Sequence, residues 1–362
     1  MKRLERLRNW LRERDYDGII LTRRDNFTWV TGGNKNHVLG STAEGIASLV
    51  ITAERIRMYA DSSDALRMEE EQNNLAAEVI TVPWYESLAE RIHSDLIGLQ
   101  VVSDTGIADT SNVQDELTGL RLKLDEQEVE RYQWIGRKCA KIVEETARGA
   151  RPGQTEEEIA NLVRCRCMQA GISPDCVLVG SDERIIKYRH PMPTDKKIYK
   201  SLMIVLGGEQ DGLYVSLTRI VYFEEIPAEI QRKYDVVQHI FASMQTLMRD
   251  GMSYREYFRE VCRLYEQSGY SQEWRFHHQG GSTGYGCREQ VIGPDSEGVV
   301  ESGHAYAWNP TIAGVKCEDT TWLSADGPKL LSGTSEWPRD RITTPGGEFS
   351  VAGILVMTDH SR

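Results

Sequence analysis

The sequence lacks the features of membrane, secreted and nucleic-acid-binding proteins. Its 362 residues contain no apolar run of about 18 residues, the length that a membrane-spanning helix needs. The first residues are charged and show no apolar segment before a small-residue cleavage site, so we expect no secretory signal. The 43 Lys and Arg against 55 Asp and Glu leave a formal net charge of −12, which argues against nucleic acid as the main partner.

Cysteine is also scarce. The chain has seven cysteines, an odd number that does not suggest a disulfide framework. Cys165 and Cys167 are separated by one residue, whereas zinc ribbons and redox sites usually have two residues between the cysteines. We therefore expect reduced thiols and a cytoplasmic location. What the chain does have is 40% hydrophobic residues, enough for a globular protein with a sizeable core.

The first third of the chain alternates segments of helix type and strand type. Residues 4–14 have helical apolar spacing, and residues 17–21 form a short apolar run suited to a buried strand. Residues 47–52 and 57–60 predict two strands joined by a hairpin-like turn, and the alternation continues to about residue 102. This pattern predicts a mixed α/β domain of about 120 residues.

The pattern changes near residue 123. Residues 125–148 predict a helix longer than any before it, which ends at a turn containing Pro and Gly. Thr155 and Glu158 have the spacing of a capping box, in which each side chain bonds the other residue's backbone N–H. We place a domain boundary here, which gives domains 1–122 and 123–362.

The second domain contains an internal echo. Residues 151–171 and 249–269 align at a constant offset of 98, and Ser253 with Glu256 repeats the capping spacing. Each copy follows a long helical pattern and precedes strands. The repeat suggests two related α+β halves around one central site, although unrelated helix-turn-helix segments can converge on such a pattern.

Several motifs together carry a family resemblance. Residues 25–32 read DNFTWVTG, and residues 120–160 contain the long helix and turn described above. Four strand-rich segments of the second domain hold most of its unusual residues: 187–193, 202–223, 277–289 and 307–321. In sequence and order these motifs resemble the creatinase, prolidase and aminopeptidase P superfamily. The resemblance implies an α/β plus α+β fold, with a small mixed α/β N-terminal domain followed by a pseudo-twofold pita-bread domain.

The resemblance also implies where metals would bind. Most members of the superfamily bind two metal ions through two Asp, one His and two Glu. The resemblance places the positions of those ligands at Leu206, Leu217, Gly281, Asn309 and Glu318. Only Glu318 is a carboxylate, and a divalent pair needs several anionic oxygens, so we expect no dinuclear centre and no cofactor. His277 and His278 are not expected to compensate, because neighbours on a strand point to opposite faces.

Creatinase-like members hydrolyse C–N bonds without metal, and the resemblance implies which residues would do so here. A His on the strand before the first lost Asp corresponds to His190, and its ordinary pKa suits acid–base work. Glu318 and Glu289 are expected to orient an imidazole or activate water. Arg288 is expected to bind a carboxylate or an oxyanion. His278 is a second candidate acid–base group. Structural alternatives stay open, namely a hydrogen-bonded structural His190 and an Arg288–Glu289 salt bridge.

These residues predict a metal-independent, creatinase-like hydrolase that cleaves a C–N bond in a small, anionic, nitrogen-containing metabolite. One alternative is an Xaa-Pro aminopeptidase or prolidase-type peptidase with an atypical metal site. Another is a catalytically inactive pita-bread homologue that binds a ligand. We expect a small-molecule substrate, no nucleic acid or membrane partner, and a homodimer. By analogy with creatinase-like dimers, a first-domain loop would reach the partner's site through Trp29, Asn34, Lys35, Asn36 and His37.

Overall fold

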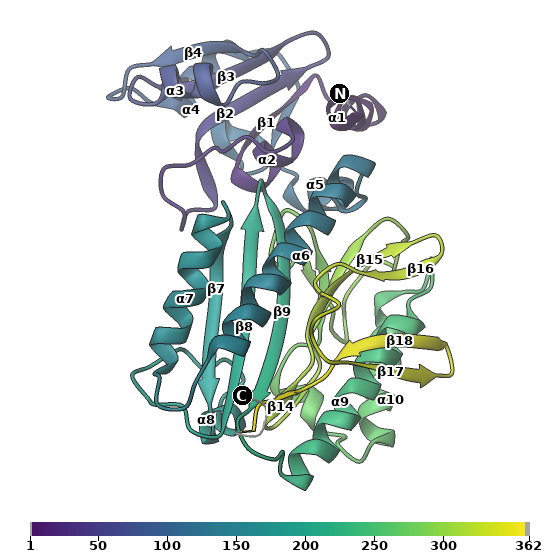
Figure 1. Cartoon of the computed structure of the whole chain (residues 1–362). Coiled ribbons are helices and arrows are strands. Elements are labelled where there is room, and N and C mark those ends of the chain that lie inside the picture. The colour runs from purple at the N-terminus through teal and green to yellow at the C-terminus, as the bar shows by residue number, and fades with distance from the viewer. Residues whose placement is uncertain (1, 359–362) are drawn as a thin grey trace. The chain divides into compact units, whose positions relative to one another are not determined.

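The structure is a computed structural model that describes residues 2–358 (Figure 1). The chain divides into two compact units between Arg121 and Leu122. Both units combine helices with strands. Within the described residues, no helix has the length and the apolar character needed to cross a membrane.

The first unit is built on a six-stranded sheet with strand order β4-β3-β2-β1-β5-β6. Its strands are β1 (Gly18–Arg23), β2 (Glu44–Thr52), β3 (Ile56–Asp61), β4 (Glu78–Val82), β5 (Val101–Ser103) and β6 (Ser111–Asn112). Its helices are α1 (Lys2–Glu13), α2 (Arg24–Thr31), α3 (Ala65–Glu71), α4 (Leu88–Asp95), the 3₁₀ turn η1 (Ile107–Asp109) and α5 (Gln114–Leu122). β2 and β3 form the predicted antiparallel hairpin, whereas β1 and β5 are parallel. The mixed α/β prediction is confirmed.

The second unit begins with the long helix α6 (Glu126–Gly149). Asp125 and Glu128 form a capping box at its start. The next helix, α7 (Glu156–Gln169), has the predicted capping box of Thr155 and Glu158. A four-stranded sheet of order β19-β9-β8-β7 follows, with α6 against β8 and β9 and α7 against β7 (Figure 1).

A second set of helices and strands repeats this plan. α9 (Ala228–Leu247) precedes α10 (Tyr254–Gln267), and a five-stranded sheet of order β11-β10-β12-β15-β16 follows. α7 and α10 have 14 residues each, and their first residues are 98 positions apart. The residue before each helix makes an isolated antiparallel bridge, Thr155 with Lys197 and Ser253 with Val299. The predicted echo therefore corresponds to two similar halves.

The remaining elements complete the second unit. They are β7 (Ser173–Ser181), α8 (Glu183–Lys187), β8 (Ser201–Gln210), β9 (Leu213–Tyr222), η2 (Glu273–Phe276), β10 (Gly280–Thr283), β11 (Gln290–Val291), β12 (Ala305–Trp308), β13 (Thr311–Ile312), β14 (Val315–Lys316), β15 (Asp319–Ser324), β16 (Gly327–Leu330), β17 (Arg339–Thr344), β18 (Gly347–Ala352) and β19 (Leu355–Val356).

One predicted strand segment is wrong. Residues 187–193 form the end of α8 and a loop, and the next strand, β8, begins at Ser201. Pro191 and Pro193 explain the difference, because proline has no N–H for a strand ladder and restricts the residue before it. His190 therefore lies in a loop and not on a strand.

Candidate functional site

Two hydroxyl side chains define one face of β9. The Thr218 hydroxyl donates to Oε2 of Glu318 at 2.7 Å, and the Ser216 hydroxyl accepts from Nη1 of Arg288 at 3.0 Å. Alternate residues of a strand point to the same face, so Ser216 and Thr218 share it. We call this side of the sheet the cleft side, because it faces the predicted site residues Glu318 and Arg288.

Leu206 and Leu217 lie on the opposite side. They pair directly across β8 and β9, and both are fully buried. Leu217 stands between the two cleft-side residues, so its side chain points to the face that α6 covers. On that face the neighbouring Arg219 pairs with Glu144 of α6 at 3.0 Å. The prediction that these leucines replace metal ligands in the cleft is wrong, because they belong to the core beneath α6.

The cleft side of these strands nevertheless carries no carboxylate. Val205 and Gly207 of β8 pair with Thr218 and Ser216 of β9, and directly paired residues point to the same face. The cleft side is therefore lined by the apolar side chain of Val205, by Gly207, and by the hydroxyls of Ser216 and Thr218. None of these is an anionic oxygen ligand.

Glu318 lies between two cations. Nζ of Lys316 is 2.8 Å from its Oε2, and Nη2 of Arg288 is 3.2 Å from its Oε1. All three side chains are at least 88% buried, with exposed fractions of 4% for Glu318, 5% for Lys316 and 12% for Arg288. We call these three residues the cationic centre, because two cations surround one carboxylate.

The charges of the cationic centre control the ionisation of Glu318. Burial alone would raise the pKa of this carboxyl, but Lys316 and Arg288, with the Thr218 hydrogen bond, lower it to about 2. Glu318 thus stays ionised and is a weak base. Its hydrogen-bond and ion-pair partners are these three side chains, and not an imidazole as predicted.

Sequence reasoning missed Lys316. Its signal was the spacing of two between Lys316 and Glu318, which on an extended segment directs both side chains to one face. Once the segment is known to be extended, a Lys and a Glu at this spacing predict an ion pair.

The remaining predicted ligand positions do not fit a dinuclear metal centre either. A Cβ atom at Gly281 would lie 1.9 Å from the carbonyl oxygen of Gln290, so this position has no room for a side chain. Asn309 offers a neutral amide. Glu318 is the one carboxylate in the set, and its oxygens are already bonded to cations. The donor set therefore fails to supply the anionic oxygens that two divalent ions need.

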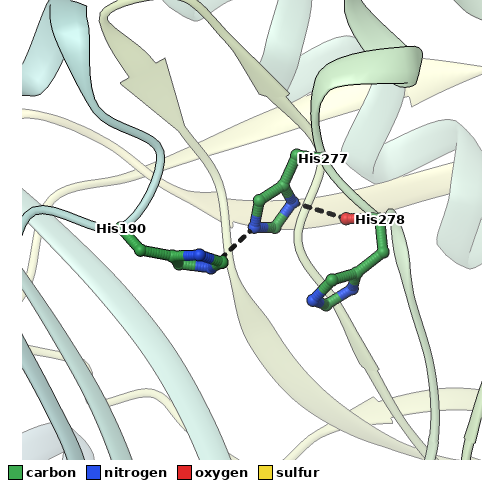
Figure 2. A group of neighbouring side chains, drawn as sticks. All are labelled: His190, His277 and His278. Atoms are coloured by element: carbon green, nitrogen blue, oxygen red, sulfur yellow. Dashed lines mark hydrogen bonds between the residues drawn. The ribbon is translucent and has the colours of Figure 1, made fainter.

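Three histidines meet in the same unit (Figure 2). His190 comes from the loop after α8, His277 follows η2, and His278 precedes β10. Nε2 of His277 lies 3.0 Å from Nε2 of His190, and the rings of His277 and His278 stack at 4.5 Å between centroids. One ring nitrogen from each lies within 4.8 Å of the others. We call these residues the histidine cluster.

The cluster corrects a second prediction. His277 and His278 were expected to point to opposite faces of a strand, but the strand β10 begins only at Gly280. The two residues lie in irregular backbone, where the period of two does not apply. The rings of His277 and His278 therefore lie side by side. The cluster contains two predicted site residues, His190 and His278, and also His277, which was not expected to contribute.

Hydrogen bonding sets the tautomers of the cluster. Nδ1 of His277 lies 2.5 Å from the carbonyl oxygen of His278, and a carbonyl only accepts, so Nδ1 carries the proton. In the neutral ring Nε2 of His277 is then an acceptor, and Nε2 of His190 must donate to it. This leaves Nδ1 of His190 with a lone pair.

The surroundings hold the cluster neutral. Burial lowers the pKa of His277 to about 3, with Lys316 and the neighbouring histidines adding to the effect. Burial, followed by Arg288, lowers the pKa of His278 to about 4. The pKa of His190 is lowered by burial and then by Lys316. At neutral pH the rings are therefore hydrogen-bond acceptors and potential ligands.

Other predicted residues have structural roles. Oε1 of Glu289 accepts the backbone N–H of Gly286 at 3.1 Å, so this carboxylate supports the turn after β10. Arg288 pairs with Glu318 and not with Glu289. In the first unit Trp29 and Asn36 are fully buried, which argues against the predicted substrate contact for these two residues.

Two buried polar atoms among the predicted site and ligand positions have no hydrogen-bond partner among the described residues. They are Nε of Arg288 and Oδ1 of Asn309. Buried polar atoms are nearly always paired in folded proteins. A bound polar molecule is one way to supply the missing partners.

The domain models agree with this architecture. A model of metallopeptidase family M24 matches residues 130–325, which is more than half of the chain, and a model of the Creatinase/Prolidase N-terminal domain matches residues 3–126. The chain belongs to metallopeptidase family M24. The resemblance to the creatinase and prolidase superfamily, and the two-domain pita-bread fold that it implies, are confirmed.

Solved dipeptidase structures match nearly all of the chain at low identity. An Xaa-Pro dipeptidase from Bacillus anthracis is 17% identical, with coverage of 98% of this chain and 99% of that chain and a TM-score of 0.78. A dipeptidase from Mycobacterium ulcerans is 16% identical, with coverage of 99% and 97% and a TM-score of 0.79. An uncharacterized peptidase from Staphylococcus haemolyticus is 21% identical over 246 residues, 64% of this chain and 69% of that protein. At these identities the structural likeness establishes the fold.

Proposed function

We propose that this M24 chain hydrolyses an amide C–N bond in a small carboxylate-bearing substrate, and that it works without the two-metal centre of the family. The histidine cluster, beside a cationic centre, is the observation that carries the proposal. Peptides come first as substrates, because the similar structures include an Xaa-Pro dipeptidase and a dipeptidase. A creatinase-type metabolite, which the sequence favoured, comes second.

The charge of the cationic centre favours an anionic substrate. Lys316 and Arg288 exceed the charge of Glu318 by one positive unit, in a setting where little water screens it. A buried cation with an unpartnered N–H, such as Nε of Arg288, can bind a carboxylate or stabilise a developing oxyanion. This positive charge would take over part of the role that metals have in metallopeptidases.

His190 is the proposed general base. It is one of the two exposed members of the cluster and lies on the loop after α8, and its Nδ1 keeps a lone pair while Nε2 donates to His277. A water bound to Nδ1 would lose its proton to His190 as its oxygen attacks the carbonyl carbon. The imidazolium would then give that proton to the amide nitrogen as the C–N bond breaks, which releases the amine and the carboxylic acid and returns His190 to its neutral form. His277, held by its own bond to the His278 carbonyl, would fix the orientation of the His190 ring.

The test is hydrolysis by chelator-treated protein. Wild type is incubated with Xaa-Pro dipeptides and with other small amides that carry a carboxylate, and the released amine is quantified. His190→Ala should lower turnover by about 10²–10⁴-fold, the usual contribution of a general base. His239→Ala is the matched control, because His239 is an exposed histidine on α9. Full activity of His190→Ala, or activity that appears only with two added metal ions per chain, would contradict the proposal.

A second candidate function is ligand binding without turnover. The low pKa of Glu318 favours it, because a carboxylate that stays ionised and ion-paired cannot take a proton from water. In that case dipeptides or related carboxylates would raise the melting temperature of wild type while no product is released. Loss of that shift in Arg288→Met would place the ligand at the cationic centre.

A further inference from the structure

We propose that the histidine cluster binds one divalent transition-metal ion of the zinc type, through residues other than those at the family's metal-ligand positions. The ligands would be ring nitrogens of His190, His277 and His278 (Figure 2). The inference stands on the arrangement of these rings and does not depend on the proposed hydrolysis.

The spacing of the nitrogens suits one ion. Bonds of about 2.0–2.1 Å to imidazole separate two tetrahedral ligand atoms by about 3.4 Å. The two Nε2 atoms of His190 and His277 are 3.0 Å apart, and the three candidate ligand atoms lie within 4.8 Å. His190 and His278 are exposed side chains, so small rotations can bring their nitrogens onto a common ion.

An outer hydrogen bond already orients the central ligand. Nδ1 of His277 donates to the His278 carbonyl, which leaves the Nε2 lone pair directed toward His190. Metal-bound histidines usually have such a bond on the nitrogen that is not the ligand. His277 is 8% exposed, so its ring is held in this orientation by burial as well.

The donors select the kind of ion. Three imidazoles suit Zn²⁺, Co²⁺, Ni²⁺ or Cu²⁺, whereas Mg²⁺, Ca²⁺ and Mn²⁺ prefer oxygen ligands. Three protein ligands leave a fourth position open. The net positive charge of the nearby cationic centre opposes a second cation and favours an anion, such as hydroxide or a carboxylate, in that position.

Metal binding and the base role of His190 exclude each other. An ion bound to Nε2 of His190 takes the place of the proton on that nitrogen. The neutral ring then carries its proton on Nδ1, so Nδ1 can no longer accept a proton from water. A zinc-type ion is therefore expected to inhibit turnover by the proposed mechanism.

The test measures binding without any substrate. Chelator-treated full-length protein is titrated with Co²⁺ and Zn²⁺ by calorimetry, and the Co²⁺ complex is followed by its visible absorption. We expect one ion per chain and no competition by Mg²⁺ or Ca²⁺. His190→Ala and His278→Ala should each weaken binding by more than the about 10–100-fold that loss of an outer-sphere partner costs. His239→Ala should bind like wild type.

Separate outcomes decide the two proposals. Absence of stoichiometric Co²⁺ and Zn²⁺ binding, or binding that survives in the His190→Ala, His278→Ala double variant, overturns the metal site. Because both substituted residues are exposed, circular dichroism should show an unchanged fold. If no ion binds while turnover still depends on His190, only the metal inference fails. If one ion binds at the cluster and raises turnover, the metal site stands and the base role of His190 fails.

Discussion

Two ion networks lie back to back around β9, and they differ in charge balance. In the first, which we call the core network, Arg219 pairs with Glu144 and with Asp319 at 3.0 Å each, and Arg339 lies 3.9 Å from Asp319. In the second, the cationic centre, two cations surround the single carboxylate of Glu318. Glu318 and Asp319 are neighbours in sequence, yet they belong to different networks.

The two networks differ in charge balance and, under the function proposed above, in their roles. The charges of the core network cancel, and the Arg219 guanidinium also donates to the carbonyls of Thr218 and Ser332. The cationic centre retains one positive charge. Each network has one buried arginine nitrogen without a hydrogen-bond partner among the described residues, Nε of Arg288 and Nη1 of Arg339, so the charge balance is what distinguishes them. A balanced network stabilises the fold, whereas one with excess charge keeps the capacity to bind an anion.

The largest effect is expected from breaking the core network. Arg219→Met removes the guanidinium and leaves Glu144 and Asp319 as buried carboxylates with one remaining cation, Arg339. We expect the free energy of unfolding to fall by about 3–5 kcal/mol, the usual cost of removing one partner from a buried ion pair. Urea denaturation followed by circular dichroism measures it. A loss below about 1 kcal/mol would show that the network does not stabilise the fold.

The next effect is expected from Glu318, and it depends on pH. The pKa of Glu318 in the folded state is about 2, below the ordinary 4.5. Its contribution to the free energy of unfolding is therefore complete above the ordinary pKa and is lost as pH falls toward 2. The shift corresponds to about 3 kcal/mol at 1.36 kcal/mol per pH unit. Glu318→Gln lacks this contribution.

Unfolding of wild type and Glu318→Gln should therefore be compared across acidic pH. The difference in free energy of unfolding should be largest at neutral pH and should shrink between about pH 5 and pH 2. A constant difference over that range would mean that Glu318 is not held ionised by Lys316 and Arg288.

The smallest effect is expected from an exposed ion pair in the same unit. Arg341 and Glu348 are 3.1 Å apart, but their side chains are 81% and 50% exposed. Solvent screens such pairs, so Arg341→Ala should change the free energy of unfolding by no more than about 0.5 kcal/mol in the same urea experiment. A loss equal to that of Arg219→Met would mean that burial does not decide how much an ion pair of this unit contributes to the free energy of unfolding.

Local features were predictable because their causes are local. The start of α7 follows from Thr155 and Glu158, whose side chains bond backbone groups three residues away. The repeat at an offset of 98 became two helices of equal length because the same capping and apolar spacing recur. The loop around His190 could also have been predicted, since Pro191 and Pro193 oppose a strand there.

The faces of the strands were not predictable. Which residues of β8 and β9 face the cleft side depends on which side of the sheet α6 covers. An alignment shifted by one residue moves Leu206 and Leu217 from one face of the sheet to the other. The same holds for His277 and His278, whose rings stack because the backbone there is irregular and not a strand.

The sequence by itself determined the family and the two-part organisation, because these are properties of residue type and spacing. Only the tertiary structure decided which side chains face Glu318 and which histidines meet. It joined Lys316 and Arg288 to Glu318 and brought His190, 87 residues before His277, to within a hydrogen bond of that ring. Such contacts depend on chain packing, and no local rule of sequence specifies them.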